Sequence, residues 1–128
     1  MTDSLDAELR LPADGVYASV LRTTTAALAA RLDFTIDDIE DLRMAVAEAT
    51  AMVLEVADPG TELISRFVLA PGEMSVAVSV GAAAPGEPDY DSFAWQVLTT
   101  LATTASVEAD AGRFTVTMTM RSTLEADT

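Results

Sequence analysis

A single glutamate, Glu48, stands among apolar side chains on one side of a predicted helix and is the residue best placed for chemistry. At helical spacing it shares that side with Met44, Ala51, Met52 and Glu55. A fully solvated helix face would carry more charge. A carboxylate in a cleft serves as a general base when its surroundings tune its pKa. Either Glu48 points into such a cleft, or the helix is covered on both sides and Glu48 reaches water at an edge; periodicity alone favours the second interpretation.

Four residue types are absent from the 128 residues: cysteine, histidine, lysine and asparagine. Their absence excludes disulfides, thiolate nucleophiles, Cys/His zinc sites, Ser-His-Asp triads, Walker lysines and Schiff bases. The formal net charge of −14 argues against direct nucleic-acid binding, because such binding relies on Lys and Arg contacts to phosphates. The same charge favours fast encounters with basic partners, although acidity also keeps a small domain soluble.

The length and hydropathy of the chain indicate one domain with a substantial core. Half of the residues are hydrophobic, yet no run approaches the ~18–20 continuous apolar residues of a membrane span. The first fifteen residues are acidic and lack the basic and apolar segments of a secretory signal. We therefore expect a cytoplasmic protein without membrane contact.

The helix that carries Glu48 is predicted over residues 36–58. Its apolar residues recur at alternating steps of three and four, and so form one stripe that a sheet would bury. Thr35 is a suitable N-cap, and Asp37 and Asp38 lie in the first turn, where carboxylates meet the positive end of the helix dipole. A Pro-Gly pair ends the helix. The stripe consists of Ile39, Leu42, Val46, Ala49, Val53 and Val56.

Five strands and two further helices are predicted around this helix. The strands after the central helix form hairpins, so we expect a largely antiparallel sheet, with helices that each bury one stripe collecting on one face. The predicted fold is therefore α+β, a two-layer α/β sandwich with a largely antiparallel mixed sheet. The predicted strands cover residues 5–11, 62–70, 73–80, 107–110 and 113–121, and the further helices cover residues 16–32 and 93–101, the latter capped by Asp91 or Ser92.

The first of these helices carries two polar outliers, Arg22 and Arg31. An arginine in such a position usually contacts solvent, and the alternative is an anchor for a protein partner. The apolar residues that follow helical spacing here are Val16, Val20, Ala27, Leu28 and Leu32.

Three stretches of the chain resemble the anti-sigma-factor serine kinases of the RsbW type, within the GHKL (Bergerat) ATP-binding fold. The most specific is DDIEDLRMAVAEA, residues 37–49, which is similar to the family's helix leading into its N box. SFAWQVLTTLA, residues 92–102, lies where the family has a glycine-rich box followed by a helix, and RFTVTMTMR near the C-terminus resembles its last strand. The resemblance implies a single GHKL-like anti-sigma-factor domain over residues 5–121, with flexible termini at residues 1–4 and 122–128.

The resemblance implies a general base at Glu48 and a departure from the family pattern one turn later. The family has a magnesium-holding asparagine in the position of Met52, and often a histidine in the position of Val56. A thioether is a soft, nearly neutral group and a poor ligand for a hard cation that prefers oxygen. Glu48 is therefore interpreted as a relic of the catalytic base, since the metal-holding neighbour is absent.

Two further elements of the family's nucleotide site are altered. The family's adenine-reading aspartate aligns with Val80, which can neither accept that hydrogen bond nor order a water. The glycine box that lets backbone amides approach phosphate corresponds to Ser92, Phe93, Ala94 and Trp95, and the ATP lid is shortened. Methionines and Phe93 or Trp95 are expected to fill the former pocket. No cofactor and no metal is expected.

The resemblance also implies partners: a homodimer that sequesters an alternative sigma factor of RNA polymerase and is countered by a STAS-domain anti-anti-sigma protein. Arg22 aligns with the arginine of the family's first helix that takes part in both contacts. With three elements of the nucleotide site lost together, we expect a degenerate, actinobacterial-like member that regulates transcription, as in stress responses, without kinase activity. The alternative is an active kinase that binds ATP and Mg²⁺ and phosphorylates its STAS antagonist through Glu48. In a third interpretation the fold is kept as a dimerisation module or as an antagonist of another regulator.

Overall fold

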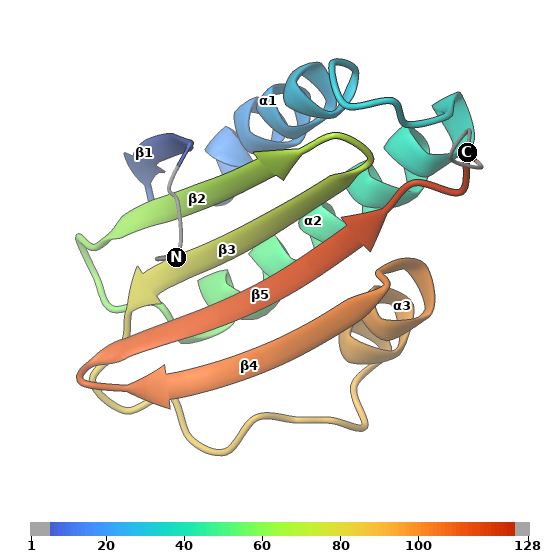
Figure 1. The fold of residues 1–128 in the computed structure, drawn as a ribbon. Coiled ribbons are helices and arrows are strands. Elements are labelled where there is room, and N and C mark those ends of the chain that lie inside the picture. Colours follow the sequence, from blue (N-terminus) through green and yellow to red (C-terminus); the bar gives the residue numbers. More distant parts are fainter. Residues whose placement is uncertain (1–5, 125–128) are drawn as a thin grey trace.

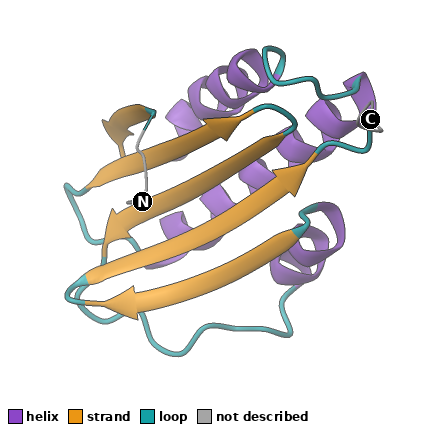
Figure 2. Ribbon diagram, in the orientation of Figure 1, coloured by secondary structure: helices purple, strands orange, loops and turns teal. Residues whose placement is uncertain are grey.

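The chain folds into one five-stranded sheet with three α-helices on one of its faces (Figures 1 and 2). The computed structural model describes residues 6–124, and the counts of elements refer to that part of the chain. The predicted two-layer α+β fold is confirmed. In chain order the elements are β1 (Ala7–Pro12), the 3-10 turn η1 (Gly15–Tyr17), α1 (Ala18–Ala29), α2 (Ile36–Val56), β2 (Glu62–Ala70), β3 (Glu73–Gly81), α3 (Phe93–Leu101), β4 (Thr104–Asp110) and β5 (Arg113–Arg121).

The sheet has the order β1-β2-β3-β5-β4, and every strand pair in the described residues is antiparallel. The hairpins β2–β3 and β4–β5 are the local pairs that the turns predict. The pairing of β3 with β5 joins distant segments and sets Val80 opposite Phe114. Two predicted strands differ at their starts: β4 begins at Thr104, and the first strand is described only from Ala7, because Leu5 lies outside the described residues.

Helix α2 crosses behind the middle of the sheet and carries most of the helical contribution to the core (Figure 1). Its N-terminus is fixed by the predicted cap: the Thr35 Oγ1 accepts a hydrogen bond from the Asp38 N–H (3.0 Å) and the Asp38 carboxylate accepts one from the Thr35 N–H (3.1 Å). This is a capping box, which satisfies two N–H groups that the helix itself leaves unpaired. The predicted apolar stripe is confirmed at Leu42, Val46, Ala49 and Val53, which are fully buried, and is half-buried at Ile39 and Val56.

The apolar stripe predicted for the first helix is confirmed only in part: Leu28 and Leu32 are half-buried against the core, whereas Val16 and Val20 are exposed. The helix begins at Ala18, so Val16 lies in the preceding 3-10 turn and is 74% exposed. The buried positions of α1 are instead Leu21, Thr25 and Ala29, at steps of four. Thr25 is tolerated in the core because its hydroxyl donates to the Leu21 carbonyl (2.8 Å), so no polar group is left unpaired. Hydrophobicity alone overlooks such a threonine.

The C-terminal segment after β5 returns to the start of α2. The Thr123 hydroxyl donates to the Asp38 Oδ1 (2.9 Å), the Thr123 N–H donates to the Asp38 Oδ2 (3.0 Å), and the Ser122 hydroxyl donates to the Asp33 carbonyl (2.8 Å). Ser122 and Thr123 belong to the terminus for which flexibility is expected, and these hydrogen bonds join them to the start of α2. The remaining expected termini, residues 1–4 and 125–128, lie outside the described residues.

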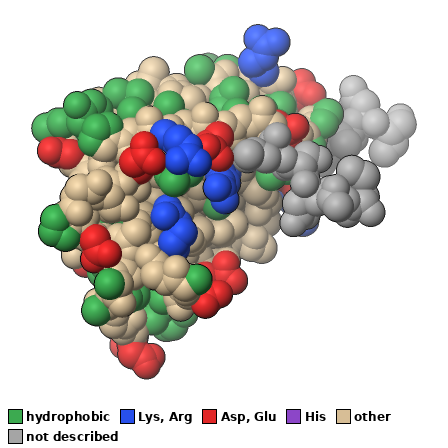
Figure 3. Space-filling model, turned by 90° about the vertical axis from the view of Figure 1, so that its left-hand side faces the viewer, with side chains coloured by type: hydrophobic (Ala, Val, Ile, Leu, Met, Phe, Trp, Pro, Cys, Tyr) green, Lys and Arg blue, Asp and Glu red, His purple; other side chains and the backbone are tan. Residues whose placement is uncertain are grey.

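Basic and acidic side chains lie next to each other on the side of the molecule shown in Figure 3. In β1 and β2, Glu8 accepts from Arg10 (2.7 Å) and from Arg66 (3.0 Å), and Arg10 also contacts Glu62 (3.1 Å). The hydrogen bond from Arg10, followed by that from Arg66, lowers the pKa of the Glu8 carboxyl. Several of the few arginines are therefore already engaged by acidic neighbours.

No helix in the described part of the chain is long and apolar enough to cross a membrane.

Candidate functional site

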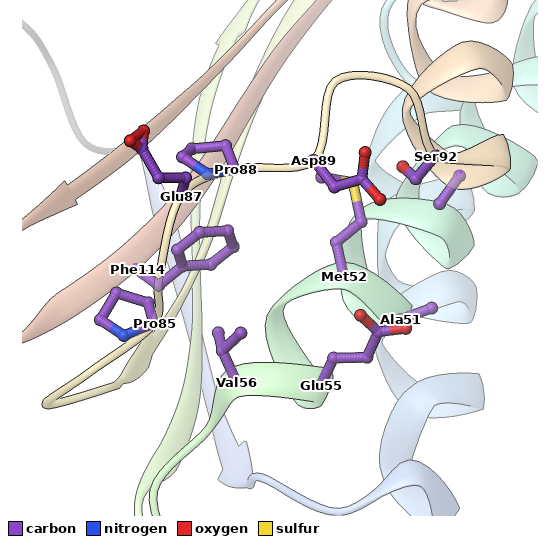
Figure 4. A pocket seen from close by; sticks show the side chains of 11 residues that line it. Ala51, Met52, Glu55, Val56, Pro85, Glu87, Pro88, Asp89, Ser92 and Phe114 are labelled. Atoms are coloured by element: carbon purple, nitrogen blue, oxygen red, sulfur yellow. The ribbon is translucent and has the colours of Figure 1, made fainter.

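A cavity of about 270 Å³ lies beside the last two turns of α2, between that helix, the loop that follows β3 and the start of α3 (Figure 4). Its lining includes Met52, the residue that the resemblance aligns with the family's metal-holding asparagine. Its lining residues are Ala51, Met52, Glu55, Val56, Pro85, Glu87, Pro88, Asp89, Ser92, Ala94 and Phe114.

The wall of the cavity formed by α2 and β5 is apolar. Helix α2 contributes Met52 and Val56, which are one turn apart, and β5 contributes Phe114, which is only 4% exposed. In Figure 4 the Phe114 ring lies between Pro85 and Pro88 of the loop. Phe114 reaches this position because it begins the inward-facing row of β5, directly across from Val80. The apolar wall thus lies at the end of the sheet where the last residues of β3 pair with the start of β5.

The charged residues that line the cavity are all acidic: Glu55 on α2, and Glu87 and Asp89 in the loop. No arginine lines the cavity. The Asp89 Oδ1 accepts from the Asp91 N–H (3.0 Å), whereas Glu55 and Glu87 make no side-chain hydrogen bond or ion pair with a described residue. Like charges gathered at one opening produce a negative potential that repels polyanions.

The N-terminus of α3 is capped by the side chain of Ser92, the residue that precedes the helix. The Ser92 Oγ accepts a hydrogen bond from the Trp95 N–H (3.1 Å), so one of the N-terminal amides that a phosphate would use is already paired. Ser92 and Ala94 line the cavity, as their aligned positions imply. Phe93 does not, because it is 77% exposed on the outside of the helix. Trp95 packs edge-on against Tyr90 (ring centroids 5.2 Å apart) and against the core.

Neither Phe93 nor Trp95, which were expected to fill the former pocket, lines this cavity, and its aromatic lining residue is Phe114. The sequence carried a signal for Phe114, since it is the first apolar residue of the alternating run RFTVTMTM. What the sequence lacked was the pairing of β3 with β5. The acidic lining was also missed, because Glu55, Glu87 and Asp89 are brought together only by the path of the loop.

Glu48 lies outside the cavity. It is half-buried on α2, does not belong to the lining, and makes no hydrogen bond or ion pair with any described residue. This geometry does not support the interpretation that Glu48 points into a cleft. It agrees with the interpretation that Glu48 reaches water at an edge of the covered helix.

Val80 is fully buried in the core and does not line the cavity. The glycine that follows it, Gly81, is explained by packing: its N–H donates to the Thr61 Oγ1 (2.8 Å), and a Cβ atom at Gly81 would lie 2.7 Å from that oxygen. A side chain at Gly81 would therefore displace Thr61. The packing against Thr61 is therefore sufficient to explain a glycine at this position.

The lining does not fit magnesium triphosphate. The metal-holding position offers the Met52 thioether, the charges are acidic, and the start of α3 is capped by Ser92. A hard cation needs several oxygen ligands in a compact set. Among the residues that the structure describes, no group of three or more His, Cys, Asp or Glu side chains is arranged to hold a metal ion.

Arg22 lies at a second place on the helical layer. It lines a hollow of about 250 Å³ with Glu40, Arg43, Met44 and Ala47 of α2, and this hollow shares no lining residue with the cavity. Arg43 is paired with Glu40 (3.0 Å). Arg22 itself makes no ion pair or side-chain hydrogen bond with any residue in the described part of the chain. A half-buried arginine without such a partner retains its donors for another molecule.

The fold and the position of the altered cavity define a GHKL-like α+β domain. No protein-family model matches the chain. Its sequence is 38% identical over 73 residues to the serine-protein kinase RsbW of Halalkalibacterium halodurans, a match that spans 56% of this chain and 45% of the relative. It is 40% identical over 58 residues to the serine-protein kinase RsbW of Bacillus velezensis, across 44% of this chain and 36% of the relative.

A solved structure of the RsbU and RsbW domains of Rv1364c from Mycobacterium tuberculosis has a similar fold. The TM-score is 0.71 at 20% identity, over 90% of this chain and 31% of that chain. Together with the sequence matches, this confirms the resemblance to the RsbW-type family that was drawn from the three stretches. The matches span less than half the length of the curated relatives.

Proposed function

We propose that this chain is an anti-sigma factor that captures an alternative sigma factor of RNA polymerase, releases it when a STAS-domain antagonist competes for an overlapping surface, and transfers no phosphate. The observation that carries the proposal is the cavity at the end of α2. Its metal-holding position is Met52, its apolar wall includes Phe114, and its charged lining residues are acidic. Each of these features opposes a magnesium triphosphate.

The protein-binding role is supported by charge and by Arg22. A net charge of −14 attracts basic protein surfaces and speeds their encounter. Arg22, which aligns with the family's partner-binding arginine, is half-buried beside α2 and makes no ion pair with a described residue. We propose that it anchors both partners and that the chain acts as a homodimer, which light scattering of the purified protein would reveal as twice the chain mass.

A phosphotransfer assay tests the absence of kinase activity. Partners are first recovered by affinity purification from the source cell and identified by mass spectrometry. The protein is then incubated with labelled ATP, Mg²⁺ and the recovered STAS protein. We expect no label on the STAS protein. Transfer of label that is lost in Glu48→Ala would overturn the proposal and establish the active-kinase alternative.

A charge reversal tests the protein-binding half. Arg22→Glu is expected to weaken capture of the recovered sigma factor and STAS protein at least about tenfold in a quantitative pull-down, as loss of an anchoring arginine does. Arg31→Glu is the matched control, since Arg31 follows the C-cap residue Ala30 of α1, is exposed and makes no ion pair with a described residue. Equal capture by the two variants would remove Arg22 from the interface.

A further inference from the structure

The outer side of the helical layer carries an apolar groove between α2 and α3. Its volume is about 270 Å³, and two of its apolar side chains are strongly exposed: Phe93 is 77% exposed and Met44 is 51% exposed. Adjoining large apolar side chains on a surface are typical of binding sites. We call this hollow the Met44 groove; it is lined by Met44, Phe93, Gln96, Val97, Thr100 and Leu101.

The lining of the Met44 groove offers apolar side chains from both α2 and α3. Phe93 and Val97 are four residues apart on α3, so they lie on one side of that helix and face Met44 across the hollow. The Thr100 hydroxyl already donates to the Gln96 carbonyl (2.7 Å), so it needs no polar partner from a ligand. Apolar anchors between two helices are the usual receptor for an amphipathic helix, and a methionine adapts its shape to the ligand.

The surroundings of the groove are acidic on the α2 side. Of the four residues that neighbour Met44 at steps of three and four, Glu40, Asp41 and Glu48 are acidic, and the fourth is Ala47. Asp41 and Glu48 make no ion pair with a described residue. The groove lining itself has no charged residue. A ligand with apolar side chains flanked by basic ones complements this arrangement.

The Met44 groove is continuous with the hollow of Arg22, because Met44 lines both. The two hollows together form one surface that crosses α1, α2 and α3. A second copy of the same chain is a poor occupant, since its own groove would bring another set of acidic side chains to the contact.

We propose that the Met44 groove binds an amphipathic helix of the captured protein, with apolar side chains on Met44 and Phe93 and basic side chains facing Asp41 and Glu48. This inference rests on the proposed function, because it extends the partner surface of Arg22 to α3.

Binding of synthetic helical peptides tests the inference without the natural partner. The probe is a fluorescein-labelled peptide of about 18 residues with leucines at steps of three and four and lysines elsewhere. A second peptide carries glutamate in place of lysine. We expect fluorescence anisotropy to show that the lysine peptide binds at least about tenfold more tightly than the glutamate peptide.

The groove variants separate this site from general attraction to an acidic protein. Phe93→Ser and Met44→Ser are each expected to weaken binding of the lysine peptide by about tenfold. Ile36→Ser is the matched control, because Ile36 is 79% exposed at the start of α2 and does not line the groove. Circular dichroism verifies that the three variants remain folded.

Equal binding by the wild-type protein and both groove variants would overturn the inference, as would equal binding of the two peptides or no binding of the lysine peptide. Conversion of a dimer to a monomer by Phe93→Ser, seen by light scattering, would also overturn it by assigning the groove to a second copy. Because the assay uses neither ATP nor a sigma factor, its failure leaves the tests of the proposed function unaffected, and failure of those tests leaves peptide binding measurable.

Discussion

The two ends of α2 hold carboxylates in opposite ways. At the N-terminal end, Asp38 is 3% exposed and accepts hydrogen bonds from Thr35 and Thr123, with the Ser122 hydroxyl 3.4 Å away. Burial raises the pKa of the Asp38 carboxyl, but the bonds from Thr123 and Thr35 outweigh it and the pKa is lowered. At the other end, Glu55 lines the cavity without such a donor.

The difference shows that the hydrogen-bond donors around a carboxylate, rather than the number of acidic residues, decide whether it stabilises the fold. The N-terminal end of α2 joins three parts of the chain: the residues before the helix, the helix itself and the segment after β5. The C-terminal end presents Met52 and Val56 to a cavity, where a nucleotide site would need oxygen ligands and cations. The N-terminal end is held by hydrogen bonds, and the C-terminal end lines a cavity with apolar and acidic side chains.

The largest expected effect concerns the apolar wall of the cavity. Phe114→Ala is expected to lower the free energy of unfolding by about 3 kcal/mol, because a buried aromatic ring is lost and a void remains. Phe93→Ala is the control and is expected to change it by less than about 0.5 kcal/mol, since Phe93 is mostly exposed. Urea denaturation followed by circular dichroism measures both. Similar losses in the two variants would contradict the burial of Phe114 in the apolar wall of the cavity.

The next effect concerns the hydrogen bonds that Asp38 accepts from Thr35 and Thr123 at the start of α2. Asp38→Ala removes the cap and leaves the Thr35 and Thr123 donors unpaired, so we expect a loss of about 2 kcal/mol. Asp37→Ala, one residue earlier in the same turn and exposed, is expected to cost less than about 1 kcal/mol through the helix dipole alone. Equal losses in urea denaturation would mean that the Asp38 hydrogen bonds contribute nothing beyond charge.

The contribution of Asp38 to the free energy of unfolding depends on pH in a definite direction. The pKa of Asp38 is lower in the folded chain than its ordinary value, so protons bind the unfolded state more readily. Its stabilising contribution is complete near neutral pH and declines as the pH falls below about 4, the ordinary value for aspartate. The stability difference between the wild type and Asp38→Asn should therefore shrink in acid, as measured by urea denaturation at several pH values. A difference that stays constant or grows would contradict the direction of the shift.

The smallest expected effect concerns Met52, near the C-terminal end of α2. Met52→Asn restores the family's oxygen ligand and is expected to cost about 1 kcal/mol, since a half-buried apolar side chain is replaced. We expect no gain of ATP affinity by calorimetry, because Phe114 and the acidic lining remain. Tight ATP binding by this variant alone would show that Met52 is the single obstacle.

The fold was predictable from the sequence because local signals agree with it. Period-two alternation defined the strands, and the stripe and Thr35 cap defined α2. The face of α1 was not predictable from hydrophobicity, since its core position Thr25 is polar and satisfied by its own helix. The hydrogen bonds from Ser122 and Thr123 to Asp38 could not be predicted from local patterns, because they join residues 84 and 85 positions apart.

The candidate site was predictable only in part. Alignment to the family placed Met52, Ser92 and Ala94, and all three line the cavity. Phe114 and Glu87 depend on the β3–β5 pairing and on the path of a loop, which no local pattern encodes. The outward direction of Phe93 likewise follows from where α3 begins.

The central claim, that the cavity beside α2 no longer takes a nucleotide, is tested most directly by titrating ATP with Mg²⁺ into the purified wild-type protein in a calorimeter. We predict no binding tighter than about 1 mM, which corresponds to no more than about 4 kcal/mol of binding free energy. Saturable binding with micromolar affinity would contradict the claim.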